Sequence, residues 1–366
     1  NHGGSFDSEE KRLLVEEHLR ALNRKHPHYD EEVSNYVRRD PARPFRKMVE
    51  QHIITTSTAK SILVFDHMLG GGATSYIENK AKSLQASGCK VSVIRYDGGL
   101  NIFSCTMRLD AMEYCCTALD VETLIGIIGG IDEIWVNELV TYPNVVQMLQ
   151  WIPKLVLDNN AKLIYFLHDF YCICQSYNLM NNEGRFCDLP DYATCNSCFH
   201  KIRSREFMGT GVGAYRMLWG DFLEKCDEVV GFSGDSIELL RKAYPGLENI
   251  VFQQHHVKPL PVVERPPKAD AGKLVVGVPG FISYIKGRDV LVDLINYVGE
   301  KGLDVEFVII GTADITKKEH EVLRPIETGQ YERDELPGLA LEKGIDVFFI
   351  PSICPETFSF RTAEVM

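Results

Sequence analysis

Residues 273–310 read KLVVGVPGFISYIKGRDVLVDLINYVGEKGLDVEFVII, and this stretch decides the fold class. Two apolar runs, Leu274–Val278 and Val305–Ile310, flank a glycine turn and a helical stretch from Arg288 to Lys301. Short apolar strands that alternate with helices are typical of parallel sheets covered on both faces. The stretch therefore predicts an α/β domain, and Val347–Ile350 predicts one further strand in it.

The same alternation of strands and helices occurs earlier in the chain. Apolar runs predict strands at Ile62–Phe65, Val91–Ile94, Glu133–Val136, Leu163–Leu167, Asp227–Phe232 and Ile250–Phe252. Between the two alternating series, residues 258–272 contain four prolines and are predicted to be a linker. We therefore expect two Rossmann-like domains, at 53–257 and 273–366.

The two ends of the chain differ from this plan. Residues 1–52 have apolar side chains at helical spacing, interrupted by prolines, and predict a helical N-terminal arm. The second domain shows only about three predicted strands, whereas sheets usually have about five or six. We therefore expect the C-terminal domain to be truncated at residue 366.

Composition excludes several classes of protein. The 366 residues include 45% hydrophobic and 25% charged residues, which excludes a disordered chain, a coiled coil and a collagen. The net charge of −12 argues against a nucleic-acid partner. No apolar run is long enough for a transmembrane segment, although peripheral contact with a membrane is compatible with the sequence. Eleven scattered cysteines and a polar start without a signal peptide favour a cytoplasmic location.

Five short motifs follow one another along the chain. They are Asp66–Gly72 (DHMLGGG), His168–Tyr171 (HDFY) with cysteines after it, Phe232–Ser236 (FSGDS) with Tyr244–Pro245, Pro279–Asp289 (PGFISYIKGRD) and Pro355–Glu364 (PETFSFRTAE). The last is similar to the E-x7-E signature of retaining family 4 glycosyltransferases, the glycosyl transferases group 1. Together the motifs resemble bacterial polysaccharide members of that family over about residues 61–366. Arg361 departs from the signature, where a small or polar residue is expected.

The resemblance implies a GT-B fold, in which two Rossmann-like domains face each other across a cleft. It implies an enzyme that moves a sugar from a nucleoside-diphosphate sugar to a hydroxyl of a glycan or lipid-linked glycan. The N-terminal domain would bind the acceptor and the C-terminal domain the donor. Catalysis would need no cofactor, and the sequence contains no Asp-x-Asp motif beside the site. Glu356 would face the sugar and Glu364 the ribose.

Charge and backbone chemistry support a donor site on the second domain. Lys286 follows a strand and a glycine turn, where its charge suits a diphosphate. Thr357, Phe358 and Ser359 are predicted to open a helix, whose free N–H groups bind phosphate oxygens. The donor-binding residues predicted in this way are Gly71, Gly72, Lys286, Thr357, Phe358 and Ser359, and the resemblance adds Gly280 and Glu364.

The predicted catalytic residues are His168, Lys286 and Glu356. His168 follows the apolar strand Leu163–Leu167, and ligands of open α/β sheets bind at the carboxyl ends of strands. We therefore expect His168 at the mouth of the cleft, where Asp169 could orient its ring.

Four cysteines in the loop 172–198 have the spacing of a structural zinc site. Cys174, Cys187, Cys195 and Cys198 could form a tetrahedral four-thiolate set with no open position for catalysis. Cys172 is an alternative ligand. Free thiols or a disulfide are equally compatible with the spacing.

Two other functions remain open at the level of sequence. Gly70-x-Gly72-x-x-Ser75, with Asp97 at the end of the next strand, imitates a dinucleotide fingerprint and would suit an NAD(P)-dependent enzyme. A truncated second domain would suit a non-catalytic, glycosyltransferase-like binding domain. Protection against heat by UDP or GDP, but not by NAD, would favour the glycosyltransferase.

Overall fold

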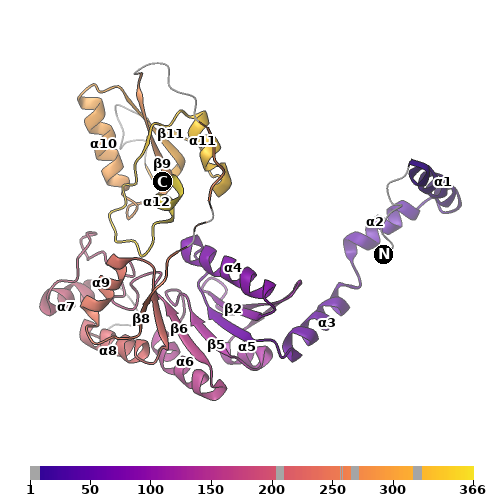
Figure 1. The fold of residues 1–366 in the computed structure, drawn as a ribbon, viewed down its shortest axis with the longest axis horizontal. Coiled ribbons are helices and arrows are strands. Elements are labelled where there is room, and N and C mark those ends of the chain that lie inside the picture. The colour runs from indigo at the N-terminus through magenta and orange to yellow at the C-terminus, as the bar shows by residue number, and fades with distance from the viewer. Residues whose placement is uncertain (1–8, 203–209, 256, 258, 265–271, 316–323) are drawn as a thin grey trace.

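The structure is a computed structural model that describes residues 9–202, 210–255, 257, 259–264, 272–315 and 324–366. It contains two α/β domains with a helical arm at one side (Figure 1). Of the predicted linker 258–272, residues 258 and 265–271 lie outside the described part.

The first domain is built on an eight-stranded sheet in the order β4-β3-β2-β1-β5-β6-β7-β8. In the part β2-β1-β5-β6-β7-β8 all neighbouring strands are parallel. At the edge, β3 pairs antiparallel with β2 and forms an antiparallel hairpin with β4. The strands are β1 (Ser61–Phe65), β2 (Lys90–Asp97), β3 (Ile102–Leu109), β4 (Met112–Ala118), β5 (Glu133–Val136), β6 (Lys162–Phe166), β7 (Glu228–Gly231) and β8 (Ile250–Phe252).

Helices cover both faces of this sheet, as the apolar strands require. Successive residues of a strand point to opposite faces. Ile62 and Val64 of β1 accordingly pack on the side of α4, while Leu63 and Phe65 pack on the side of α5, α6 and α8. The helices are α4 (Gly71–Ala86), α5 (Val121–Ile128), α6 (Val145–Asn159), α7 (Tyr192–Lys201), α8 (Val212–Leu223) and α9 (Gly234–Ala243).

The second domain has a smaller sheet in the order β11-β10-β9-β12, with all pairs parallel. Its strands are β9 (Leu274–Ile282), β10 (Val305–Ala313), β11 (Ile326–Glu327) and β12 (Val347–Phe348). The helical elements are α10 (Arg288–Glu300), η1 (Arg333–Glu335), α11 (Leu336–Glu342) and α12 (Phe360–Val365). Within the described residues the sheet thus has four strands, one more than the sequence predicts, because the short β11 carries no apolar run.

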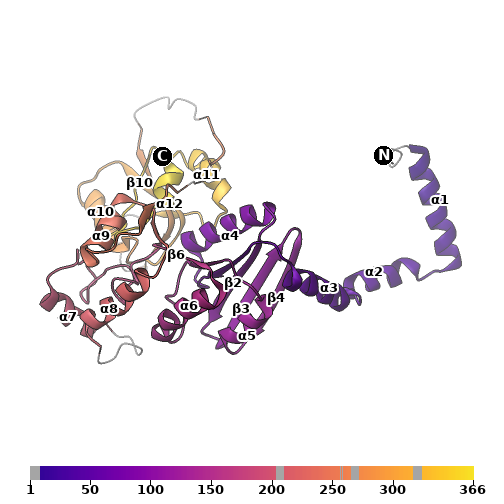
Figure 2. The ribbon, with the colours of Figure 1, turned by 60° about the horizontal axis from the view of Figure 1, so that its bottom comes forward.

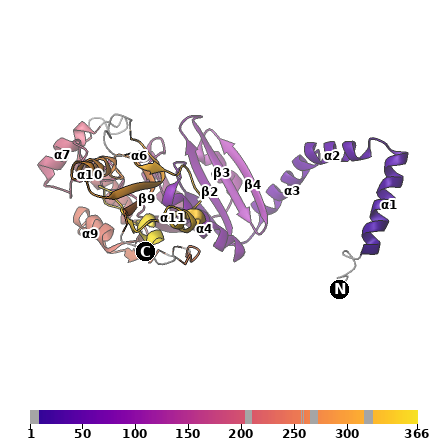
Figure 3. The ribbon, with the colours of Figure 1, turned by 90° about the horizontal axis from the view of Figure 1, so that it is seen from above.

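The arm consists of α1 (Glu9–Lys25), α2 (Tyr29–Arg39) and α3 (Arg43–Thr56). It extends away from both domains (Figures 2 and 3) and is joined to the first domain through α3, whose Ile54 is buried. Helix α3 continues to Thr56, so the helical segment is longer than the predicted arm of residues 1–52. Among the described helices, none has the length and apolar character needed to cross a bilayer.

Both sheets have a topological switch point, where the chain leaves neighbouring strands in opposite directions. In the first sheet this point lies between β1 and β5, and in the second between β9 and β12. Open parallel sheets bind ligands in the crevice at the carboxyl ends of such strands. The two domains are Rossmann-like and lie beside each other (Figure 1). A cleft lined by both domains separates them, which is the predicted GT-B arrangement.

Candidate functional site

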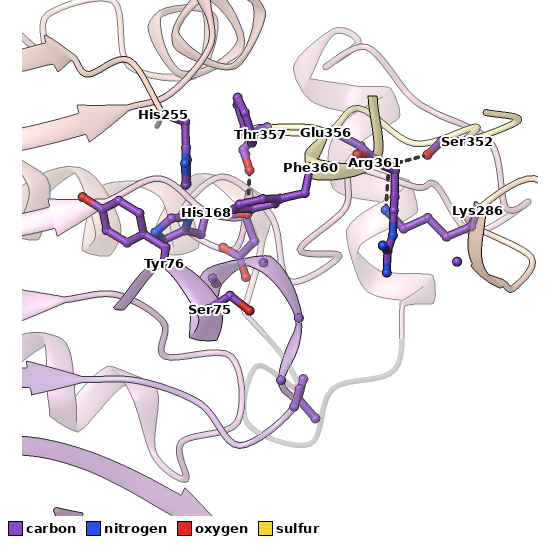
Figure 4. Close-up of a pocket in the computed structure, with 18 of the residues that line it drawn as sticks. Ser75, Tyr76, His168, His255, Lys286, Ser352, Glu356, Thr357, Phe360 and Arg361 are labelled. Atoms are coloured by element: carbon purple, nitrogen blue, oxygen red, sulfur yellow. Dashed lines mark hydrogen bonds and ion pairs between the residues drawn. The ribbon is translucent and has the colours of Figure 1, made fainter. Parts of the chain in front are cut away.

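A cleft of about 1450 Å³ separates the two domains and is lined by the loops at both switch points. From the first domain come the glycine loop with Gly70–Gly72 and the strand ends with Glu138, His168 and Asp169. From the second domain come the loops after β9 and β12. Figure 4 shows Tyr76, His168 and His255 on one side of this space and Lys286 and Glu356 on the other.

Lys286 and Glu356 form an ion pair, although 70 residues separate them in the sequence. Lys286 Nζ lies 2.6 Å from Glu356 Oε1, which also accepts a hydrogen bond of 2.9 Å from Ser352 Oγ. Burial alone would raise the pKa of Glu356, but the charge of Lys286 and hydrogen bonds from Lys286, Ser352 and Ser359 outweigh it, so the pKa lies below its ordinary value. Glu356 is therefore ionised, and Lys286 is held at the cleft as a cation.

Gly287 allows the Lys286 loop to lie against the loop after β12. Its φ is +81°, and a Cβ there would lie 1.9 Å from the carbonyl oxygen of Pro351. No side chain fits this position, so the contact between the two loops depends on glycine. Gly280 lies at the end of β9, where Arg361 Nε would be 3.2 Å from an added Cβ.

The segment 357–360 differs from the prediction. Helix α12 begins at Phe360 with Ser359 as its N-cap, so Thr357, Phe358 and Ser359 lie before the helix and do not form its first turn. Ser359 Oγ accepts a hydrogen bond from the Thr362 amide, a local interaction that fixes the helix start. Thr357 Oγ1 donates to the carbonyl oxygen of His168 at 2.7 Å, across the cleft.

Aromatic side chains join the two domains next to this hydrogen bond. The ring of Phe358 stacks on His255 with 4.4 Å between centroids, and Phe360 meets the same imidazole edge-on at 4.6 Å. A Cβ added to Gly72 would lie 2.4 Å from the Phe360 ring, so the glycine loop makes room for it. Of the predicted donor-binding residues, Phe358 thus packs against the first domain. Gly71 is the first residue of α4 and lines the cleft with Gly72.

Glu364 is held by two arginines on the wall of the second domain. Arg333 Nε lies 2.9 Å from Oε1, and Arg361 Nη1 lies 2.8 Å from Oε2. Arg361 Nη1 also donates to Tyr331 Oη at 3.0 Å. Arg361, the residue that departs from the family signature, therefore presents its guanidinium to the cleft beside Gly280. An arginine in this place suits an anionic ligand group.

His168 follows β6 and lines the cleft, as expected from the sequence, but its ring is not oriented by Asp169. Asp169 Oδ1 instead accepts the Tyr171 amide at 2.8 Å. The His168 ring stacks on Phe232 at 4.6 Å, and its buried Nε2 has no hydrogen-bond partner in the described part of the chain. Burial, with the neighbouring His255 and His67, lowers the pKa of His168 to about 3. The imidazole is neutral and offers an unpaired ring nitrogen at the cleft.

We expect His168 to make the protein less stable in mild acid. Since its pKa in the folded state is about 3, below its ordinary value, the unfolded chain binds more protons in this range. The stabilisation is complete above about pH 6.5 and is lost as the pH falls. Between pH 7.5 and 5 the Tm of His168→Gln should therefore fall less than that of the wild type. Parallel Tm curves for the two proteins would contradict this expectation.

Sequence reasoning did not identify Glu138 or Asp66 as site residues. Both follow apolar strands, β5 and β1, so the strand-end rule applied to His168 would have found them. Asn137 Nδ2 donates to Asp66 Oδ1 at 2.8 Å and joins the two strand ends.

The four cysteines of the predicted zinc site lie in one part of the first domain. Cys195 and Cys198 are on α7, and Cys174 and Cys187 pack at the edge of the core. No disulfide is formed, and among the described residues no three His, Cys, Asp or Glu side chains are arranged to hold a metal ion. Burial raises the pKa of Cys174 to about 12. Zinc binding by the four cysteines therefore stays a prediction.

Elemental analysis of protein purified without chelators tests it. The cysteine spacing predicts about one zinc per chain, because four thiolates bind Zn²⁺ in a closed set. A loop without its own core should also unfold at lower temperature when the metal is removed. Metal-free protein with freely titratable thiols and an unchanged Tm would contradict the zinc site.

Comparison with known proteins gives distant likenesses only. No protein-family model and no curated protein matches the chain. The catalytic domain of starch synthase IV from Arabidopsis thaliana, solved with ADP and acarbose, is 13% identical, with a TM-score of 0.46, over 83% of this chain and 80% of that chain. The apo lipopolysaccharide outer core galactosyltransferase WaaB is 11% identical, with a TM-score of 0.47, over 80% and 74%. The pneumococcal O-GlcNAc transferase GtfA, solved with UDP and GlcNAc, is 9% identical, with a TM-score of 0.45, over 83% and 81%.

Proposed function

We propose that the chain is a retaining glycosyltransferase that moves a sugar from a nucleoside-diphosphate sugar to a hydroxyl of a glycan or lipid-linked glycan. One observation carries this proposal. The loops after β9 and β12 bring Lys286 and Glu356 into contact at the switch point of the second sheet, directly across the cleft from His168 and the glycine loop.

The charges on the second domain suit a diphosphate as leaving group. Lys286 and Arg361 line the cleft as cations, so negative charge that develops on the departing diphosphate is stabilised there. Glu356 Oε1 holds Lys286 Nζ at 2.6 Å, and the second carboxylate oxygen can accept a hydrogen bond from a hydroxyl of the donor sugar. We infer that Glu364, which is bonded to Arg333 and Arg361, accepts hydrogen bonds from the ribose hydroxyls.

The alternative of an NAD(P)-dependent enzyme has less support. In the dinucleotide pattern the acid at the end of the second strand binds the ribose. Here Asp97 Oδ1 accepts the amides of Gly99 (2.8 Å) and Leu100 (3.0 Å) in its own turn. Gly72 is in contact with Phe360, so the glycine loop serves the contact between domains.

A screen of nucleotide sugars tests the proposed function. We expect release of nucleoside diphosphate from at least one donor, faster when glycan acceptors are added, and a product that keeps the anomeric configuration of the donor. Activity should persist in EDTA, because Lys286 supplies the charge. Failure to turn over any UDP-, GDP- or ADP-sugar, together with reduction or oxidation of a nicotinamide cofactor, would contradict the proposal.

A further inference from the structure

The N-terminal arm exposes apolar side chains on all three of its helices. Across the described residues of α1, α2 and α3, only Ile54 is buried. The arm extends away from both domains, so the described part of this chain does not cover it (Figures 2 and 3). A contiguous apolar surface that stays open to solvent marks an interaction site.

Helix α2 carries the most regular part of this surface. Tyr29, Val33, Tyr36 and Val37 recur at intervals of three and four residues, so they lie on one side of the helix. Their exposed fractions run from 37 to 69%. The same spacing places core residues between two helices that pack along their length.

The charged side chains of α2 fall into two groups. Glu31 and Arg38 lie opposite the apolar stripe, and each contacts a neighbour three residues away on its own chain. Glu32 and Arg39 are seven residues apart, so both lie on the same flank of the stripe. Within the described residues, neither Glu32 nor Arg39 takes part in an ion pair. The flank thus carries one acid and one base that are both open to a partner.

We propose that α2 pairs antiparallel with α2 of a second copy of this chain and forms a symmetric dimer. A two-fold axis perpendicular to the helices reverses their direction and brings the same flank of both copies together. Glu32 of each copy then faces Arg39 of the other, so both ion pairs form at once. In the adjacent layer, Val33 of each copy packs on Tyr36 of the other.

The charges favour this occupant over others. In a parallel pair opposite flanks meet, and Glu32 would face the apolar Val37. Residues 1–56 contain equal numbers of acidic and basic side chains, so the net charge of −12 belongs to the rest of the chain. The arm therefore has no excess of positive charge to attract anionic lipid headgroups or nucleic acid. Self-complementary charges beside an apolar stripe match a second copy.

Helix α3 adds apolar area next to α2. Phe45, Val49 and Ile53 are exposed, on the side of α3 opposite the buried Ile54. Helix α2 is only 11 residues long, which is short for a helix that must be stable in water by itself. We therefore expect the dimer to bury apolar side chains of α3 as well as those of α2.

Sedimentation equilibrium of the full chain over a range of micromolar concentrations tests the dimer. We expect Glu32→Arg and Arg39→Glu each to raise the dimer dissociation constant at least tenfold, because each variant places like charges together twice in one dimer. The double variant Glu32→Arg/Arg39→Glu should dimerise like the wild type, and a mixture of the two single variants should form the heterodimer. Glu31→Arg is the matched control, since it makes the same change one residue away on the outer side of α2.

A wild type that stays monomeric at all concentrations would overturn the proposal. So would a dimer that neither charge reversal weakens, or one that Glu31→Arg weakens as much as Glu32→Arg. A monomer that binds vesicles of phosphatidylcholine and phosphatidylglycerol through the arm would replace the second copy by a membrane. Circular dichroism checks the helix content of each variant, and the regain of the dimer in the double variant excludes misfolding as the cause of its loss.

Discussion

Lys286→Ala is expected to lower kcat/KM for sugar transfer about 1000-fold, the upper range for removal of a charge that stabilises a leaving group. Lys286 forms an ion pair with Glu356 at the switch point of the second sheet. Its positive charge can stabilise the negative charge of the departing diphosphate. The fold should remain intact, because Lys286 lies in a partly exposed loop and its removal leaves no core cavity. Circular dichroism and Tm would verify this.

The control is Lys343→Ala, which removes a lysine of the same domain that pairs only with its exposed neighbour Glu342 among the ion pairs described. This variant should keep wild-type activity. Glu356→Gln should also lose most of the activity, since the amide no longer holds the Lys286 ammonium. Wild-type turnover by both Lys286→Ala and Glu356→Gln would contradict the assignment of the donor site.

Gly287→Ala is expected to abolish donor binding and to lower the free energy of unfolding by about 3 kcal/mol, the cost of strong local backbone strain. The added Cβ would lie 1.9 Å from the Pro351 carbonyl oxygen, and φ is already +81°. The Lys286 loop must then move away from the loop after β12, which separates Lys286 from Glu356.

Gly302→Ala separates strain from collision. Gly302 lies in the same domain at φ +61°, and nothing is within 4 Å of its added Cβ. Its cost should be about 1 kcal/mol, the left-handed backbone penalty alone, with normal nucleotide affinity. Denaturant unfolding and calorimetry with UDP, GDP and ADP measure both effects. Equal losses of stability and affinity in the two variants would contradict the role of the close contact at Gly287.

The sequence predicts the loops after β9 and β12 well because their signals are local. Apolar runs mark β9 and β12, and the strand-end rule places the residues after them at one edge of the sheet. The meeting of Lys286 and Glu356 follows from that topology. The partners of the glutamates do not follow from the topology. The resemblance implies that Glu364 faces the ribose, whereas in the structure Glu364 is bonded to Arg333 and Arg361.

The segment 357–360 could not be predicted, because contacts from the other domain decide it. Thr357 and Phe358 are compatible with a helix start. In the structure, however, Thr357 donates a hydrogen bond to the His168 carbonyl oxygen, and the Phe358 ring stacks on His255. Ser359 also competes as an N-cap and moves the start of α12 to Phe360.

The β3–β4 hairpin was missed for a different reason. Ile102–Leu109 alternates buried and half-buried residues with polar side chains between them, so it contains no continuous apolar run. A search limited to parallel, fully buried strands does not find such an edge hairpin.

Calorimetric titration of UDP, GDP, ADP and NAD into the wild type and Lys286→Ala decides whether the second domain binds a nucleoside diphosphate through Lys286. We expect at least one nucleoside diphosphate to bind the wild type, Lys286→Ala to weaken this binding at least tenfold, and NAD not to bind. Binding of NAD with no response to nucleoside diphosphates, or equal diphosphate affinity in both proteins, would contradict it.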